Sequence, residues 1–259
     1  MMSSLPVKFH FIMTKTVFQA PIYRLTLNLD RRAQENLALQ EQLHYIYEMQ
    51  GETMLRFAEL AAENRKKHIK SYEDLAERDT EGKKLLLELA QKTKPLEMNG
   101  KNIASFGKTS TGKSTLTNGL LEKDVASTGY GETTLKSTPY KGIGYVLWDV
   151  RGNNDETSYL SMKYISFLKG LTKRLVMIQS TIKENSSLIK LLDDMNLGYD
   201  IVVNKFDLIE ESEQQNFKDQ IQREIATLQL KKLNKIFYIS AKYRERYPDW
   251  QELINYLTN

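Results

Sequence analysis

Hydrophobic and polar positions follow two different periods along the chain, and the change falls near residue 100. Residues 30–93 contain no proline and are rich in leucine, alanine, glutamate, glutamine, lysine and arginine, which favour helices. Seven positions spaced four and three residues apart form one helical stripe with two polar interruptions, namely Leu39, Leu43, Ile46, Gln50, Thr53, Phe57 and Leu60. We predict two or three helices folded as a hairpin, because one helix of about 60 residues would be about 90 Å long.

Individual residues predict where further helices in this region begin and end. Ser71, followed by the acidic residues Glu73 and Asp74, predicts a helix start with the serine as N-cap. Leucines over residues 85–89 predict a last helix, which ends at Lys94-Pro95 because the residue before a proline avoids helical angles. Residues 5–29 are apolar and partly alternating, which predicts one or two short strands there.

After residue 101, short apolar runs alternate with amphipathic stretches. The runs predict strands at residues 102–106, 145–149, 174–179, 200–204 and 235–240. The stretches predict helices that begin near Lys113, Thr157, Ser186, Glu211 and Asp249. This alternation indicates an α/β fold with a mostly parallel sheet and helices on both faces. We therefore predict a mainly helical N-terminal region over residues 1–98 and an α/β domain over residues 99–259; the pattern leaves open whether the two pack together.

Composition narrows the chemistry. The chain has 259 residues, 41% of them hydrophobic and 27% charged, which is typical of a globular protein. Cysteine is absent and the three histidines all precede residue 70, which excludes thiol chemistry and a histidine triad or zinc site in the α/β domain. A net charge of +4 is too weak to indicate a nucleic-acid or membrane partner. With no apolar run of spanning length and no signal-peptide pattern, we expect a cytoplasmic protein.

One motif carries the strongest chemical signal. Residues 107–114 match G-x-x-x-x-G-K-[ST] between a predicted strand and a predicted helix, which is the setting of a phosphate-binding P-loop. Backbone N–H groups and the helix N-terminus bind the phosphates, and we expect Lys113 to reach the β- and γ-phosphates and Ser114 to ligate Mg²⁺. The predicted nucleotide contacts here are Gly107, Lys108, Thr109, Ser110, Thr111, Gly112, Lys113, Ser114 and Thr115.

Three further motifs follow in order after predicted strands. Asp149 and Gly152 form D-x-x-G, in which we expect Asp149 to hold Mg²⁺ through water and the Gly152 N–H to meet the γ-phosphate. Residues 204–207 form N-K-x-D. The third motif is the tripeptide at residues 240–242. The ordered set is far more specific than any one motif, and it predicts a P-loop domain that binds a guanine nucleotide.

The base specificity has a physical reason. Guanine offers two adjacent donors, N1–H and the 2-amino group, and the Asp207 carboxylate can accept both, whereas adenine would leave it unpaired. The stem of Lys205 can pack on the base, and Asn204 can connect its loop to the P-loop. The Ala241 N–H is expected to donate to the guanine oxygen. The predicted base contacts are Asn204, Lys205, Asp207, Ser240, Ala241 and Lys242.

The segment between the P-loop helix and the D-x-x-G strand is a candidate switch. It contains Glu132, Thr133 and Thr134 after two glycines. One threonine is expected to ligate Mg²⁺ and to sense the γ-phosphate through its backbone N–H. A flexible loop fits this composition equally well, and it is the position between the two motifs that favours the functional interpretation.

These residues resemble the immunity-related GTPases. That family carries G-x-x-E-T-T, then T-P-Y and a W-D element, which correspond here to residues 129–134, 138–140 and 148–149; residues 181–185 resemble its R-F-K-E-N-D segment. The likeness spans residues 101–259 and implies a dynamin-superfamily-like GTPase that dimerises through its nucleotide face and hydrolyses GTP slowly unless assembled. It also implies Thr134 as the Mg²⁺ ligand and Glu132 as the residue that positions or activates the attacking water, so Lys113, Glu132 and Thr134 are the candidate catalytic residues. Arg151 stands where the family has proline.

The sequence leaves catalysis and partners open. Many small GTPases orient the attacking water with a glutamine after D-x-x-G, but Asn153 stands here, so we expect slow intrinsic hydrolysis. Arg151 is interpreted as a surface charge rather than as a donor near the γ-phosphate. The basic cluster at residues 65–70 is interpreted as a solvated helix face rather than as a site for anionic lipid or RNA; we expect no nucleic-acid partner, and peripheral membrane contact has no support.

Two functions follow from this pattern. The first is a Mg²⁺-dependent GTP hydrolase that is activated by homodimerisation through its GTP-binding domain. The alternative is a scaffold that holds GTP or GDP with little or no hydrolysis and recruits a protein partner through its N-terminal helices. The apolar stripe at residues 39–60 is interpreted as core packing, with a partner helix as the alternative.

Overall fold

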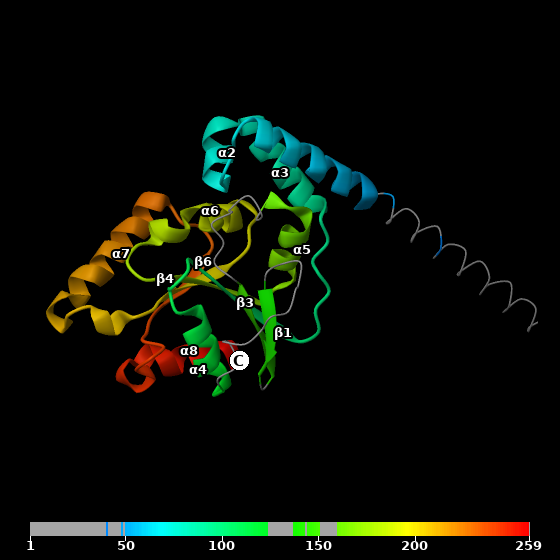
Figure 1. The fold of residues 1–259 in the computed structure, drawn as a ribbon. Coiled ribbons are helices and arrows are strands. Elements are labelled where there is room, and N and C mark those ends of the chain that lie inside the picture. The colour runs from blue at the N-terminus through cyan, green and yellow to red at the C-terminus, as the bar shows by residue number, and fades with distance from the viewer. Residues whose placement is uncertain are drawn as a thin grey trace, which may run out of the picture. The chain divides into compact units, whose positions relative to one another are not determined.

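The computed structural model describes residues 50–123, 137–142, 144–150 and 160–258, together with Gln40 and Glu48. The chain divides into two compact units, Met1–Glu52 and Thr53–Asn259. The second unit is built on a six-stranded sheet with the order β2-β3-β1-β4-β5-β6 (Figure 1). The strands predicted within residues 5–29, and the stripe positions before Gln50, lie outside the described residues.

Five strands of this sheet are parallel, and all five were predicted. They are β1 (Lys101–Phe106), β3 (Tyr145–Val150), β4 (Lys173–Ile178), β5 (Tyr199–Val203) and β6 (Leu233–Tyr238). Each lies within two residues of its predicted bounds. Parallel strands buried on both faces read as nearly continuous apolar runs, which is why the sequence signal was strong.

The sixth strand, β2 (Ser137–Lys141), was not predicted. It contains the Thr-Pro-Tyr residues that were assigned to the switch segment, and it pairs antiparallel with β3, with Pro139 opposite Trp148. A proline has no N–H to donate, but an edge strand has a neighbour on one side only and tolerates the loss. A five-residue strand with a proline at its centre gives almost no periodic signal.

Helices cover both faces of the sheet, as predicted. The α4 helix (Lys113–Leu121) and the α8 helix (Pro248–Thr258) pack on one face, where Leu116 and Leu253 share a buried cluster with the strand residue Val202. The other face carries α5 (Met162–Gly170), α6 (Ser186–Asp194) and α7 (Gln214–Leu228). Four predicted helix starts match α4, α6, α7 and α8, with the three-residue turn Glu211–Glu213 leading into α7. The start predicted near Thr157 lies outside the described residues, and α5 begins at Met162.

Helices also form N-terminal to the sheet. Residues 50–66 are helical, and α2 (Tyr72–Arg78) and α3 (Thr80–Lys92) follow. The Ser71 cap is confirmed, because its Oγ accepts a hydrogen bond from the Asp74 N–H at 3.0 Å. Asp79 caps α3 in the same way through the Gly82 N–H, at 3.0 Å. The residue types at these starts therefore satisfy N–H groups that the helices themselves leave unpaired.

The helices from Thr53 onward share one core with the sheet. Phe57, Leu75 and Leu86 belong to the same buried cluster as Ile165 of α5 and Leu192 of α6. Figure 1 accordingly places α2 and α3 over the face that carries α5 and α6. The core interpretation of the apolar stripe is thus confirmed at Phe57 and also at Leu60, which are 5% and 4% exposed.

Polar contacts reinforce this docking. The ammonium of Lys169, at the end of α5, donates to the carbonyls of Ala90, Gln91 and Thr93 at the C-terminus of α3. A cation is favourable there because the helix dipole leaves a partial negative charge at that end. On α2, the Glu73 carboxylate pairs with Lys190 of α6 at 2.6 Å. Helices α3 and α2 are therefore held by α5 and α6 respectively.

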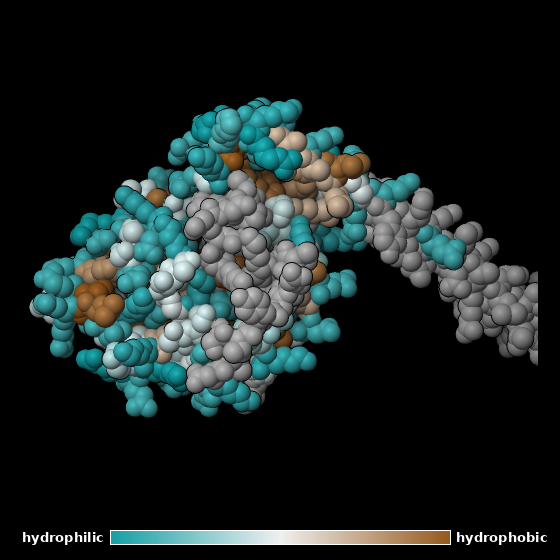
Figure 2. All heavy atoms as spheres, viewed as in Figure 1, coloured by the Kyte–Doolittle hydropathy of each residue, from teal (hydrophilic) through white to brown (hydrophobic). Residues whose placement is uncertain are grey.

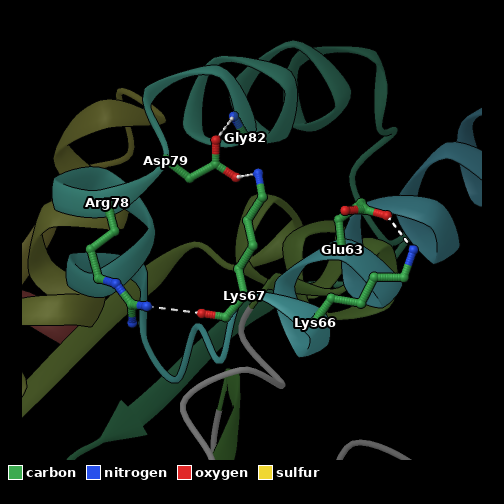
Figure 3. A network of polar contacts seen from close by, with 6 residues as sticks. All are labelled: Glu63, Lys66, Lys67, Arg78, Asp79 and Gly82. Carbon is green, nitrogen blue, oxygen red and sulfur yellow. Dashed lines mark hydrogen bonds and ion pairs between the residues drawn. The ribbon is translucent and has the colours of Figure 1, made fainter.

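Two lysines of the basic cluster at residues 65–70 are paired with carboxylates. Figure 3 shows the Lys67 ammonium donating to the Asp79 carboxylate. The Arg78 guanidinium donates to the Lys67 carbonyl at 2.9 Å. Lys66 pairs with Glu63 at 2.7 Å. These pairings favour the solvated-face interpretation of the cluster.

Apolar surface is also present on the helix of residues 53–66, where Figure 2 shows a brown patch beside mainly teal neighbours. Met54 and Leu55 lie on this helix and are both 66% exposed. Among the described helices, none combines the length and the apolar character that crossing a membrane requires.

We predict that Leu86→Ala lowers the stability of the unit that begins at Thr53 by about 3 kcal/mol, because it leaves a cavity at a fully buried position. Calorimetric unfolding with and without GDP measures the effect. The transition that GDP stabilises is expected to move to lower temperature. Leu96→Ala is the matched control, since this leucine is 40% exposed and its loss should cost less than about 0.5 kcal/mol. An unmoved GDP-dependent transition would mean that α3 is not part of that unit.

Candidate nucleotide-binding site

The P-loop connects the buried strand β1 to the N-terminus of α4. Its backbone has positive φ at Gly107, Ser110 and Gly112 (150°, 69° and 90°), so the chain curls tightly on itself. Gly112 is the N-cap of α4 and offers no side chain to the first turn. The first N–H groups of α4 therefore remain available to a phosphate, which the positive end of the helix dipole attracts.

Gly112 also marks where two loops meet. A Cβ atom at this position would lie 2.2 Å from the Asn204 Nδ2 atom. This approach is closer than any side chain permits, and the φ of 90° independently favours glycine. The second glycine of the motif therefore serves loop packing in addition to the phosphate.

Lys113 lies folded over the P-loop. Its Nζ donates to the carbonyls of Gly107 and Lys108, both at 2.9 Å, and the residue is only 8% exposed. Burial lowers the pKa of Lys113, whereas the negative charge of Asp149 acts in the opposite direction. The ammonium is thus desolvated in advance and surrounded by neutral acceptors, which a phosphate oxygen can replace.

Ser114 and Asp149 come together from α4 and β3, as a shared Mg²⁺ site requires. The Ser114 Oγ donates to the Asp149 Oδ2 at 2.9 Å. The other carboxylate oxygen, Oδ1, is buried and has no hydrogen-bond partner among the described residues. A hydroxyl beside a carboxylate with a spare oxygen is a donor set that suits Mg²⁺, which takes few protein ligands and completes its shell with water and phosphate.

A separate cavity of about 340 Å³ lies beside the P-loop at the ends of β5 and β6. It is lined by the predicted base contacts Asn204, Lys205, Asp207, Ser240, Ala241 and Lys242, by Gly112 and Thr115 of the P-loop region, and by Leu208 and Tyr243. Its volume lies at the lower end of the range for small-molecule sites. The structure therefore gathers the two base motifs, which are far apart in sequence, around one hollow.

Asn204 connects the three loops of the site. Its Nδ2 donates to the Thr111 carbonyl at 2.8 Å, which confirms the predicted connection to the P-loop. Its Oδ1 accepts from the Ala241 N–H at 2.9 Å. That N–H was expected to donate to the guanine oxygen, and here it donates to Asn204. The asparagine is 2% exposed, so both bonds are shielded from water.

The remaining predicted residues are distributed as follows. Lys108, Thr109 and Ser110 of the P-loop are exposed. Lys205 adopts a left-handed conformation (φ 60°) and directs its Nζ to the Gln179 Oε1 at 3.4 Å. The predicted contacts Glu132, Thr133, Thr134 and Gly152, together with Arg151, lie outside the described residues.

Sequence reasoning missed two residues that line the base cavity and one that contacts the Lys205 side chain. Leu208 and Tyr243 line the cavity, and Gln179 meets the Lys205 ammonium. Leu208 and Tyr243 directly follow the two recognised base motifs, so their adjacency was an available signal. Gln179 directly follows β4 and has no motif of its own.

This arrangement defines the class of protein. A P-loop that opens a helix, a serine and a carboxylate at its mouth, and a cavity lined by N-K-x-D describe a P-loop GTPase. Residues 102–239 match the family model of the 50S ribosome-binding GTPases, and the chain belongs to this family. The matched residues run from β1 through β6 and contain both the P-loop and the N-K-x-D motif.

Individual proteins are similar to parts of the chain. The T-cell-specific guanine nucleotide triphosphate-binding protein 2 of Mus musculus is 35% identical over 124 residues, which cover 44% of this chain and 30% of the relative. The match thus spans less than a third of that relative.

The similar solved structures have a lower sequence identity to this chain. Translation elongation factor SelB from Methanococcus maripaludis is 19% identical with a TM-score of 0.45, over 62% of this chain and 33% of SelB. The FeoB G-domain from Methanococcus jannaschii is 20% identical with a TM-score of 0.40, over 62% of this chain and 99% of that domain.

We predict that Asp207→Asn changes the base preference from guanine to xanthine, because an amide can donate to the oxygen that xanthine carries at position 2. GDP affinity should fall by at least about 100-fold, the loss that leaving a buried polar partner unpaired commonly causes. Competition binding with GDP and XDP measures it. A variant that still preferred GDP would contradict the assignment of Asp207.

Gly112→Ala tests the contact between the two loops. The added methyl group would collide with the Asn204 amide and force an unfavourable φ, a cost of about 2 kcal/mol or more. We expect weaker binding of GDP and of GTP alike, measured by fluorescent-nucleotide titration. Gly144→Ala is the control, because this glycine also has positive φ (82°) but has nothing within 4 Å of a Cβ atom.

Proposed function

We propose that this chain hydrolyses GTP with Mg²⁺, slowly as a monomer, and that contact between two nucleotide faces accelerates it, as the resemblance to immunity-related GTPases implies. The observation that carries the catalytic part is the convergence of Lys113, Ser114 and Asp149 at the mouth of the P-loop. Loop connections through Asn204 bring the base cavity to the same place.

The residues present suit Mg²⁺. Ser114 and Asp149 would hold it, with Thr134 as the further ligand that the resemblance to immunity-related GTPases implies. The unpartnered Asp149 Oδ1 supports this assignment, since a buried carboxylate oxygen without a donor is costly. When bound, the ion supplies positive charge to the β- and γ-phosphate oxygens.

The protein's own groups account for phosphate binding and charge stabilisation. The N–H groups of the P-loop and the first turn of α4 bind the phosphates. Lys113 exchanges its two carbonyl acceptors for phosphate oxygens and stabilises the charge that develops as water attacks the γ-phosphorus and the bond to the bridging oxygen breaks. Because Lys113 is already desolvated, this exchange needs little rearrangement.

A slow rate is supported by the residue that follows D-x-x-G. Asn153 is too short to hold a water as the glutamine of many small GTPases does. Glu132 and a residue supplied by a second copy are the candidates for completing the site. The 35% identity to a guanine nucleotide triphosphate-binding protein supports this family comparison. A cytoplasmic location is part of the same proposal, and so is recruitment of a protein partner by the N-terminal helices, which the exposed Met54 and Leu55 favour.

The decisive experiment measures GTP turnover per chain over a range of protein concentrations. We expect specific activity to rise by about tenfold or more as the chain dimerises, since completing a GTPase site in trans has large effects. Lys113→Ala should lower the maximal rate by at least about 100-fold. Analytical ultracentrifugation on the same samples, with a GTP analogue and with GDP, reports the oligomer.

The outcomes separate the alternatives. Activity that is independent of concentration would contradict activation by dimerisation while leaving hydrolysis intact. A rate unaffected by Lys113→Ala would contradict the assigned site. Nucleotide that binds tightly but turns over at no concentration would favour the scaffold function. Lys84→Ala is the control, because this lysine lies exposed on α3 and is not one of the site residues.

A further inference from the structure

Two exposed apolar side chains stand at the base cavity. Five large hydrophobic side chains are exposed in the part of the chain that the structure describes, and two of them, Leu208 at 67% and Tyr243 at 42%, line this one hollow. Leu208 follows the N-K-x-D motif and Tyr243 follows the Ser-Ala-Lys tripeptide. An aromatic ring beside a cavity offers a large apolar surface to the molecule that occupies it.

The backbone of Tyr243 is fixed by the network that shapes the cavity. Its N–H donates to the Ser240 Oγ at 3.0 Å, and Ser240 is fully buried. Ala241, which directly follows Ser240, donates its N–H to Asn204, and Asn204 is itself bonded to the P-loop at Thr111. Tyr243 therefore keeps a set position relative to the phosphate site.

The segment after Tyr243 is anchored as well. The Tyr243 carbonyl accepts from the Arg246 N–H at 3.2 Å in the short turn Arg244–Arg246. The Arg244 side chain donates to the Gly119 carbonyl of α4 at 3.4 Å and lies over the Trp250 ring, 5.7 Å from its centroid. The backbone that carries Tyr243 is therefore anchored to α4, the helix that follows the P-loop.

Cations lie close to the same ring. The Lys242 Nζ is 4.9 Å and the Arg246 guanidinium carbon 5.8 Å from its centroid. Both cations lie over the ring at distances that give a favourable cation–π attraction. These cation contacts do not account for the placement of Leu208 and Tyr243 in the lining of the cavity.

We propose that Tyr243 is a further guanine-contacting residue, whose ring forms a wall of the base cavity and packs against the bound base. The inference rests on the guanine site proposed above. A purine presents two flat faces, and the stem of Lys205 is assigned to one of them. Aromatic contact with a base is favourable for any base because every base has a π-face, so Tyr243 adds affinity while Asp207 sets specificity.

This role has a distinctive signature. The contact is made to the base, so its loss should weaken GDP and GTP by the same factor. It should raise KM without changing kcat, because the base interacts equally in the ground state and the transition state. A residue that acted on the phosphates would instead separate GTP from GDP or lower kcat.

The experiment compares Tyr243→Leu with Tyr243→Phe in the full chain. We expect Tyr243→Leu to weaken GDP and GTP about tenfold each, and Tyr243→Phe to stay within about twofold of wild type. Leu96→Ala is the control, since Leu96 has a similar exposure of 40% and lies outside the cavity lining. Uniformly ¹³C-labelled GDP provides a direct readout, because its C8–H and C1′–H signals shift when an aromatic ring is nearby; Tyr243→Leu should move them and Leu96→Ala should not.

Three results would overturn the proposed role of Tyr243. Unchanged affinity and unchanged GDP signals in Tyr243→Leu would overturn the inference while leaving the guanine site intact. Equal losses in the leucine and phenylalanine variants would overturn it too, because the hydroxyl and not the ring would then be responsible. A wild-type chain that failed to bind GDP would overturn the site itself along with this role for Tyr243.

Discussion

One buried amide, that of Asn204, joins the parts on which nucleotide binding depends. Its nitrogen holds the Thr111 carbonyl of the P-loop and its oxygen holds the Ala241 N–H of the loop after β6. These loops follow β1, β5 and β6, three strands of one parallel sheet whose carboxyl ends lie at the same edge. A parallel sheet brings loops to one edge but does not fix the distances between them. The amide does so, and the glycine at 112 is required because the amide is so close.

The sheet and its helices supply the rigid base for this arrangement. Strands β1, β4 and β5 are buried on both faces, so the loops at their ends start from fixed positions. On one face, α5 follows the D-x-x-G strand and also receives the helices from Thr53 onward. Helix α5 therefore shares one buried core both with Val150 at the end of β3 and with the helices from Thr53 onward.

The sequence predicted the sheet and the site well where each element carried its own signal. Apolar runs gave the five parallel strands, and the P-loop and N-K-x-D motifs gave residues that the structure places together. It failed where the signal was short or non-local. The edge strand β2 has five residues and a proline, and Tyr243 lies beside a tripeptide that is weak alone. The docking of α2 and α3 depends on contacts such as Glu73 with Lys190, which no local pattern reveals.

The contact between Lys169 and the end of α3 has a practical consequence for anyone dissecting this protein. The motifs suggest that a minimal GTPase fragment could begin at residue 99. Such a fragment would lack Leu86 and Leu89, which share a buried cluster with α5. It would also leave the Lys169 ammonium without its three carbonyl acceptors. The newly bared surface would be apolar and continuous with the sheet core, so the fragment would tend to aggregate. Expression trials are therefore better started at or before Thr53, where the compact unit begins.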